Sequence, residues 1–167
     1  MKQLFLSSFF VLGLILFVSV VNAQTSIVER GKVKARIITT NDKTDIQAAE
    51  LLQDFVKRIS GAELAILYKG TPSKNDIVIG DNDYNKSIDK NSLKYDGFRL
   101  VNKEGVLQIV SGGGKGVLYA VVTLLENYLG VGYWGENEYS FTKTNTISLP
   151  KIDLIDNPAF RYRQSQN

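Results

Sequence analysis

Residues 97–129 read GFRLVNKEGVLQIVSGGGKGVLYAVVTLLENYL, and the spacing of apolar residues changes within them. Gly97–Val101 and Val106–Val110 flank a polar turn that ends in glycine, which is typical of a β-hairpin. From Lys115 to Leu129 the apolar residues recur at helical spacing instead, and Gly130 follows as a stop signal. These apolar positions are Leu118, Val121, Val122, Leu125, Tyr128 and Leu129. The stretch therefore predicts a hairpin that leads into a buried helix.

An amphipathic helix is predicted over Thr44–Ser60, upstream of the hairpin. Its apolar residues are Ile46, Ala49, Leu52, Phe55, Val56 and Ile59. Thr44 and Gln47 have the spacing of a capping box, and Gly61 is placed to end the helix. Asp54 on the polar face is placed to pair with Lys57 or Arg58, so this face is expected to be solvated surface.

Short strands account for most of the remaining apolar segments. Lys32–Ile37 alternates charged and apolar residues, as a half-buried strand does. Leu64–Tyr68 and Ile77–Ile79 are continuous apolar runs, and Val131–Trp134 and Ile147–Leu149 are predicted to close the sheet. Two helices with six or seven strands predict an α+β fold, a mixed-sheet sandwich of two layers.

The first 23 of the 167 residues have the pattern of a secretory signal peptide. Lys2 precedes an apolar run from Leu4 to Val21, and Val21-Asn22-Ala23 is a small-residue cleavage site. An uncleaved membrane anchor is the alternative, because the run is about as long as the shortest spanning helices. We expect cleavage before Gln24, an exported periplasmic or extracellular product, and no membrane contact afterwards.

Composition excludes several kinds of chemistry. The sequence has no cysteine and no histidine, which removes disulfides, thiol catalysis and the usual ligands of zinc and haem. The formal charge of +3 is spread among mixed charges, so a nucleic-acid partner is not expected. We predict no catalytic residues, no bound cofactor and no metal site.

Two motifs suggest ligands but lack the residues that binding needs. Gly112–Gly116 lies between a predicted strand and a helix, yet a P-loop requires Ser or Thr where Gly116 stands. Asp81–Asn85 begins like a calcium loop, but Lys86 and Ser92 replace the glycine and glutamate that complete one. A tight structural turn and a solvated loop are the simpler interpretations, with a weak surface cation site left open at the second.

The chain resembles the accessory domain that precedes the catalytic barrel in bacterial α-glucuronidases, β-N-acetylhexosaminidases and their uncharacterised relatives. The resemblance rests on Gly116–Ala120, Leu124–Glu126, Leu129–Trp134 and the closing Pro158-Ala159-Phe160-Arg161-Tyr162-Arg163. It implies a two-layer sandwich, a mixed β-sheet with two helices packed on one face, and no catalytic residue of its own. In those families the last motif marks entry into the barrel, so residues 24–151 are expected to form the domain and 152–167 a linker and the start of a barrel. Gln164 stands where hexosaminidases usually have glycine, which favours the α-glucuronidase-like or uncharacterised branch.

Aromatic residues near the end of the second helix are the candidate contact site. Trp134, Tyr139 and Phe141 are the candidates for an interface or sugar contact. Core packing is the favoured interpretation for Trp134, whereas Tyr139 and Phe141 are equally suited to the core and to a contact with a neighbouring domain. Glu136 and Glu138 lie beside them, but nothing marks them as a catalytic pair. The expected function is a non-catalytic domain packed against a glycoside hydrolase barrel. A free-standing carbohydrate-binding or interaction module is the alternative.

Overall fold

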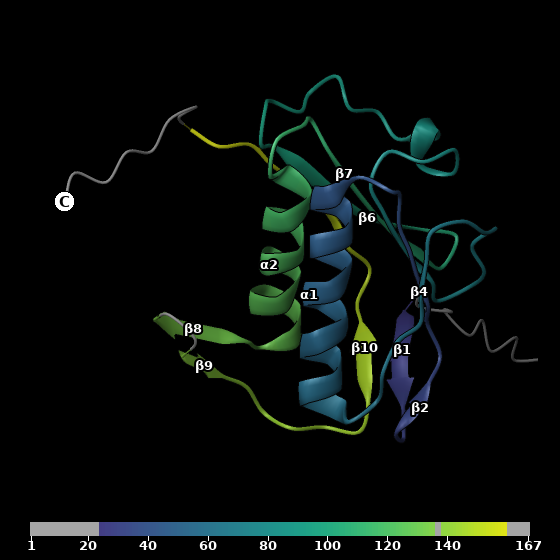
Figure 1. Ribbon diagram of the computed structural model, residues 1–167, viewed down its shortest axis with the longest axis vertical. Coiled ribbons are helices and arrows are strands. Elements are labelled where there is room, and N and C mark those ends of the chain that lie inside the picture. The colour runs from purple at the N-terminus through teal and green to yellow at the C-terminus, as the bar shows by residue number, and fades with distance from the viewer. Residues whose placement is uncertain (1–23, 136–137, 160–167) are drawn as a thin grey trace, which may run out of the picture.

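A computed structural model describes residues 24–135 and 138–159. Two helices, α1 (Lys43–Ser60) and α2 (Gly116–Leu129), lie side by side over one face of a β-sheet (Figure 1). The strands of the described residues are β1 (Thr25–Glu29), β2 (Lys32–Val33), β3 (Ile37–Ile38), β4 (Ile66–Leu67), β5 (Ile77–Ile79), β6 (Phe98–Lys103), β7 (Val106–Ser111), β8 (Gly132–Gly135), β9 (Glu138–Ser140), β10 (Ile147–Leu149) and β11 (Asp153–Asp156). The predicted α+β sandwich is confirmed.

The main sheet is mixed, with strand order β11-β6-β7-β5-β3-β4. β3 pairs in parallel with β4 and β5, and β5 pairs in parallel with β7. β6 and β7 form the predicted antiparallel hairpin, in register from Phe98 opposite Ser111 to Lys103 opposite Val106. A smaller sheet of order β10-β1-β2 adds its buried residues to the same core.

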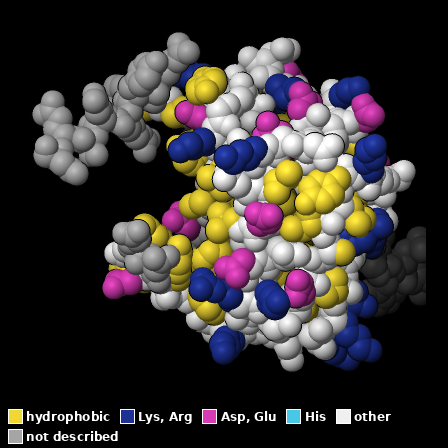
Figure 2. Space-filling view, in the orientation of Figure 1, with side chains coloured by type: hydrophobic (Ala, Val, Ile, Leu, Met, Phe, Trp, Pro, Cys, Tyr) yellow, Lys and Arg dark blue, Asp and Glu magenta, His cyan; other side chains and the backbone are white. Residues whose placement is uncertain are grey.

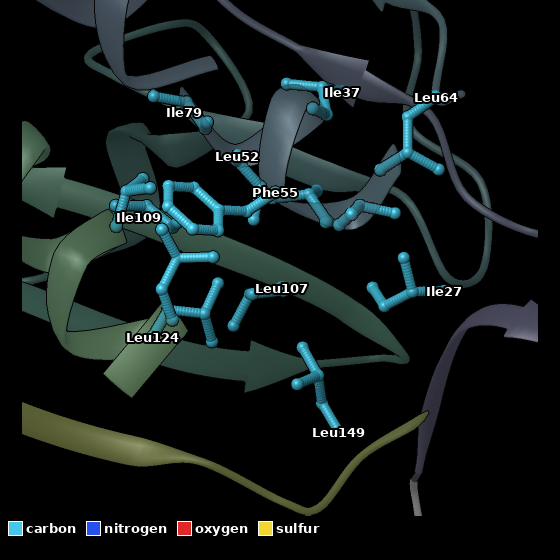
Figure 3. Packing of buried hydrophobic residues seen from close by; sticks show 14 of the residues in the cluster. Ile27, Ile37, Leu52, Phe55, Leu64, Ile79, Leu107, Ile109, Leu124 and Leu149 are labelled. Atoms are coloured by element: carbon cyan, nitrogen blue, oxygen red, sulfur yellow. The ribbon is translucent and has the colours of Figure 1, made fainter. Parts of the chain in front are cut away.

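The core lies between the helices and the sheet. α1 contacts β4 and β5, whereas α2 contacts β6 and β7. Figure 3 shows Leu52 and Phe55 of α1 among Leu107 and Ile109 of β7 and Leu124 of α2. All five side chains are at most 3% exposed, so the two layers are closely packed.

The start of α1 differs from the predicted capping box. Asp42 is the N-cap, and its Oδ1 accepts hydrogen bonds from the backbone N–H groups of Thr44 and Asp45, at 2.7 and 3.3 Å. A carboxylate two residues earlier satisfies the free N–H groups that Thr44 was expected to serve. Gly61 ends the helix in the left-handed conformation as predicted, and Arg58 pairs with Asp54 at 3.5 Å.

Two segments differ from their predicted structure. Lys32–Ile37 is not one strand: β2 pairs with β1 in the small sheet, and β3 begins at Ile37 in the main sheet. The predicted linker from Ile152 onward contains β11, which pairs with β6 from Asp153 opposite Val101 to Asp156 opposite Phe98. Pro158 restricts the backbone of its immediate neighbour Asn157. It does not prevent a strand that ends at Asp156, so it was no evidence for a linker over the residues before Asn157.

The glycine-rich turn before α2 is structural, as predicted. A Cβ on Gly112 would lie 2.2 Å from the carbonyl oxygen of Lys94, and one on Gly116 would lie 2.6 Å from that of Gly97. Glycine is therefore needed where this turn passes close to the loop that precedes β6.

Replacing Gly112 with alanine is expected to lower the free energy of unfolding by roughly 1–3 kcal/mol, because the added methyl group meets backbone that cannot rotate away. Lys115→Ala in the same turn is the control, since Lys115 is exposed and its side chain makes no capping hydrogen bond. Urea unfolding of both variants measures the difference. Equal stabilities would contradict this account of the turn.

Residues 1–23 and 160–167 lie outside the described residues, so the predicted signal peptide and the motif around Phe160–Arg163 are not placed. Within the described part of the chain, neither helix is long and apolar enough to cross a bilayer.

Candidate interaction surface

The aromatic residues predicted as the contact site come from a separate two-stranded sheet. β8 and β9 pair antiparallel, with Tyr133 opposite Tyr139, and project beyond the C-terminal end of α2 (Figure 1). Among the described residues no further strand joins this hairpin. Neither edge of this hairpin is therefore covered by another described strand.

Trp134 is not in the core, and the prediction for it is wrong. The residue is 76% exposed, and its indole Nε1 donates a hydrogen bond to Ser140 Oγ at 2.9 Å. The helical pattern of residues 115–129 suggested that the next apolar residues would continue into the core. Instead, Gly130 and Gly132 turn the chain into the projecting hairpin, where Trp134 is held by its own hairpin partner.

Tyr139 and Phe141 connect the hairpin to α1. The Tyr139 ring packs edge-on against Phe55, with ring centroids 5.0 Å apart, and the Phe141 ring lies 6.4 Å from the same residue. The Arg58 guanidinium lies over the rings of Phe55 and Tyr139, at 5.4 and 5.6 Å from their centroids. Phe141 packs against the core, whereas Tyr139 keeps 37% of its surface exposed. A contact of Tyr139 with a neighbouring domain or a sugar stays a prediction.

Val122 also differs from its predicted position. It was assigned to the buried side of the second helix, but it is 37% exposed and lies on the outward side of α2 with Tyr119, which is 45% exposed. Ala120 and Leu124 occupy the buried side and are fully covered. An almost entirely apolar helix gives no contrast between its two sides, so the periodicity could not identify the outward side.

The structure does not bring together the two acidic residues beside the aromatic cluster within the residues that it describes. Glu136 lies outside them, and Glu138 is exposed on β9. No group of three or more acidic residues in the described part of the chain could hold a metal ion. Asp81 and Asp83 of the calcium-like loop instead pair with Lys90 and Lys86.

A hollow of about 560 Å³ lies where β3, β5 and β7 end and the two helices begin. Asp42, Asp45, Asp81 and the glycines Gly112–Gly114 are among its lining residues. This edge of a parallel sheet is a common ligand site, and its lining includes parts of both motifs that the sequence analysis singled out, Asp81 and Gly112–Gly114. Whether its carboxylates are available to a ligand depends on the contacts that they already make.

Asp45 is the most perturbed of these carboxylates. Burial raises the pKa of the Asp45 carboxyl, a hydrogen bond from Thr40 opposes the rise, and the charges of Asp42 and Asp81 add to it. Thr40 Oγ1 donates to Asp45 Oδ2 at 2.5 Å, and a Cβ on Gly80 would lie 1.9 Å from the same oxygen. With Asp42 capping α1 and Asp81 paired to Lys90, each of the three carboxylates has a structural partner. We therefore interpret Asp42 and Asp45 as supports of the start of α1, and Asp81 as one partner of a surface ion pair.

Comparison with known proteins identifies the family. Residues 22–128 match the model described as glycosyl hydrolase family 20, domain 2. The chain belongs to this family. The expected resemblance to accessory domains of glycoside hydrolases is thus confirmed, and the family 20 domain has the mixed sheet with two helices that the resemblance implied.

Solved structures share the fold of the family 20 domain. Streptomyces plicatus N-acetyl-β-hexosaminidase superposes with a TM-score of 0.57 at 14% identity, over 85% of this chain and 25% of that one. Vibrio harveyi exo β-N-acetylglucosaminidase gives 0.51 at 21% identity, over 84% and 18%. A family GH115 4-O-methyl-α-glucuronidase with specificity for decorated arabinogalactans gives 0.57 at 18% identity, over 77% and 18%.

The chain spans a quarter or less of the length of these three proteins. At these identities the likeness establishes the fold. The search of curated proteins found no match to this chain.

Proposed function

We propose that this chain is a non-catalytic accessory domain of an exported, carbohydrate-degrading glycoside hydrolase, and that it packs against a catalytic barrel. The match of residues 22–128 to domain 2 of family 20 carries the proposal. The resembling enzymes are hexosaminidases and an α-glucuronidase, so hydrolysis of a hexosaminide or a glucuronide is the activity expected of the whole enzyme.

The contacts of the acidic residues support a role without proton transfer. A glycosidase needs two carboxyl groups on either side of the scissile bond, about 5–10 Å apart and open to a sugar. Asp45 is 6% exposed and bonded to Thr40, and Asp81 is bonded to Lys90. Asp45 is held by its contact at the start of α1, and Asp81 is already paired with a cation.

Export is the part of the proposal that rests on the sequence pattern of residues 1–23. The apolar run from Leu4 to Val21 and the small-residue site before Gln24 support it. An exported domain without cysteine depends on its core for stability, and the closely packed layers around Leu52 and Leu107 are consistent with that.

A carbohydrate-binding module remains a second candidate because Tyr133 and Trp134 are exposed side by side in sequence, at 58% and 76%. Aromatic rings with free faces suit sugar rings. The two candidates differ in what the chain alone does. A binding module retains sugar, whereas an accessory domain has no affinity for it.

The purified 167-residue chain is expected to release no chromophore from aryl N-acetylglucosaminides or aryl glucuronides. It is also expected to give no heat of binding with chitooligosaccharides or with xylan fragments that carry glucuronic acid. Spectrophotometric assay and isothermal titration measure these two results. Turnover by the chain would refute a non-catalytic role, and saturable binding that Trp134→Ala removes would establish the binding module instead.

A further inference from the structure

The outward sides of the two helices differ in composition. The exposed residues of α1 are Lys43, Gln47, Glu50, Asp54, Lys57 and Arg58, all polar or charged. On α2 the exposed residues are Tyr119, Val122, Glu126 and Asn127, and the helix contains no basic residue. A helix that is apolar on nearly every side is normally covered on every side, whereas a charged outer side is normally solvated. The outer side of α2 is therefore the one that fits a partner.

The β8–β9 hairpin extends this surface at the C-terminal end of α2. Tyr133 and Trp134 are the most exposed large apolar residues among those described. A two-stranded hairpin is at best marginally stable in water, and this one is connected to the rest of the domain through Tyr139 on Phe55. Figure 2 shows that the side of the molecule above the hairpin is hollowed and lined by hydrophobic side chains. A partner seated there would cover both the hairpin and α2.

The path of the chain after β11 points to the same side. Asn157 Oδ1 accepts a hydrogen bond from the backbone N–H of Lys94 at 2.8 Å, and its Nδ2 donates to the carbonyl of Ser92 at 3.1 Å. Gly97 lies between Asn157 and the start of α2. A Cβ on Gly97 would lie 2.2 Å from Asn157 Oδ1, and a Cβ on Gly116 would lie 2.6 Å from the carbonyl oxygen of Gly97. Asn157 is thus held against Gly97, which itself lies close to the first residue of α2, and the yellow end of the described chain runs near the start of α2 in Figure 1. A module that follows in the chain leaves from this end of the surface.

We infer that the outer side of α2 and the β8–β9 hairpin, represented by Tyr119, Val122, Tyr133 and Trp134, form the surface that packs against the catalytic barrel of the same chain. The inference rests on the proposed function and adds which surface is used. Glu126 is the one charged residue of α2. The surface of the barrel that faces α2 is therefore expected to be apolar, with one basic or hydrogen-bonding group placed opposite Glu126. The outer side of α1 stays in water.

Single cysteines test the inference, because the sequence contains none. Val122→Cys and Tyr133→Cys report on the proposed surface, and Glu50→Cys on the outer side of α1 is the matched control. Each is introduced into the 167-residue chain and into the complete product of the gene, including whatever follows Asn167. The rate of reaction with a neutral maleimide is measured at the substituted peptide by mass spectrometry.

In the 167-residue chain the three cysteines are expected to react at similar rates, since all three positions are exposed. In the complete product, labelling at positions 122 and 133 is expected to slow on the order of tenfold or more, because the centre of an interface excludes solvent, while labelling at position 50 stays unchanged. Val122→Arg, compared with Glu50→Arg, provides a second measurement. It is expected to lower Tm only in the complete product.

The outcomes separate the two proposals. A gene that encodes no barrel after Asn167 removes both of them. A barrel that hydrolyses glycosides, together with unchanged labelling at positions 122 and 133, overturns only the assignment of this surface. Slower labelling at position 50 in place of position 122 assigns the interface to α1, and it overturns the inference equally.

Discussion

Replacing Asp76 with alanine is expected to lower the free energy of unfolding by about 3–5 kcal/mol, because the variant leaves a charged partner and buried donors without their acceptor. Asp76 is 1% exposed. Its carboxylate accepts hydrogen bonds from the backbone N–H groups of Arg36 and Ser73, at 2.9 and 2.8 Å, and from the guanidinium of Arg36 at 2.5 Å. It therefore ties the segment before β3 to the turn before β5. Urea unfolding at pH 7 measures the loss.

The pH dependence of this effect has a definite sign. Burial alone would raise the pKa of Asp76, but hydrogen bonds from Arg36 and Ser73 outweigh it and hold the pKa below its ordinary value. A lowered pKa in the folded state stabilises the protein above the unfolded-state value of about 3.9, and this contribution is lost as the pH falls through the folded-state pKa. The difference between wild type and Asp76→Ala is therefore expected to shrink below about pH 4.

The control for Asp76 is Asp83→Ala. Asp83 is also paired with a cation, Lys86, but its side chain is 94% exposed. Its removal is expected to leave Tm unchanged. An Asp76→Ala variant as stable as Asp83→Ala would show that the Asp76 contacts contribute nothing to the folded state.

Phe55→Ala is expected to cost roughly 3–5 kcal/mol of stability, because it removes a buried aromatic ring and leaves a cavity at the contact between α1 and the hairpin. Phe55 is 3% exposed and packs edge-on against both Tyr139 and Phe141. The loss of this support should also release the hairpin. Trp134, the sole tryptophan of the sequence, reports on that release through its fluorescence.

Phe55→Leu separates ring contacts from simple burial. Leucine keeps most of the apolar volume but loses the edge-on contacts and the position beneath Arg58, so a smaller cost of roughly 1–1.5 kcal/mol is expected. Denaturant unfolding followed by Trp134 fluorescence measures both variants. If the alanine and leucine variants were equally stable, the cavity term would be negligible and the described packing of Phe55 would be incorrect.

Local patterns predicted the elements that depend on local contacts. The β6–β7 hairpin and both helices follow from a turn and from periodicities within single stretches, and the glycine stop at Gly61 follows from one residue. Strands that depend on distant partners were harder to predict. β1 was not predicted, and β11 was assigned to a linker, because Thr25–Glu29 and Asp153–Asp156 are strands by virtue of pairing with β10 and β6.

The proposed interaction surface was predictable in composition but not in geometry. The aromatic cluster after the second helix drew attention to the residues that form the exposed β8–β9 hairpin, yet Trp134 was assigned to the core and Val122 to the buried side of the helix. Apolar side chains are usually buried, so the pattern of a single sequence does not indicate which of them are exposed. The contrast between α1 and α2 became visible once the two helices were seen to share one face of the sheet.

The pairing of β1 with β10 sets when the domain can close during synthesis. Thr25 lies opposite Leu149 and Val28 opposite Ile147, so β1 can pair with β2 at once but receives β10 only after nearly all of the domain has left the ribosome. Such distant partners delay completion of the sheet, while the helices and the β6–β7 hairpin can form as soon as they emerge. The small sheet of the nascent domain is therefore expected to stay incomplete until β10 has emerged.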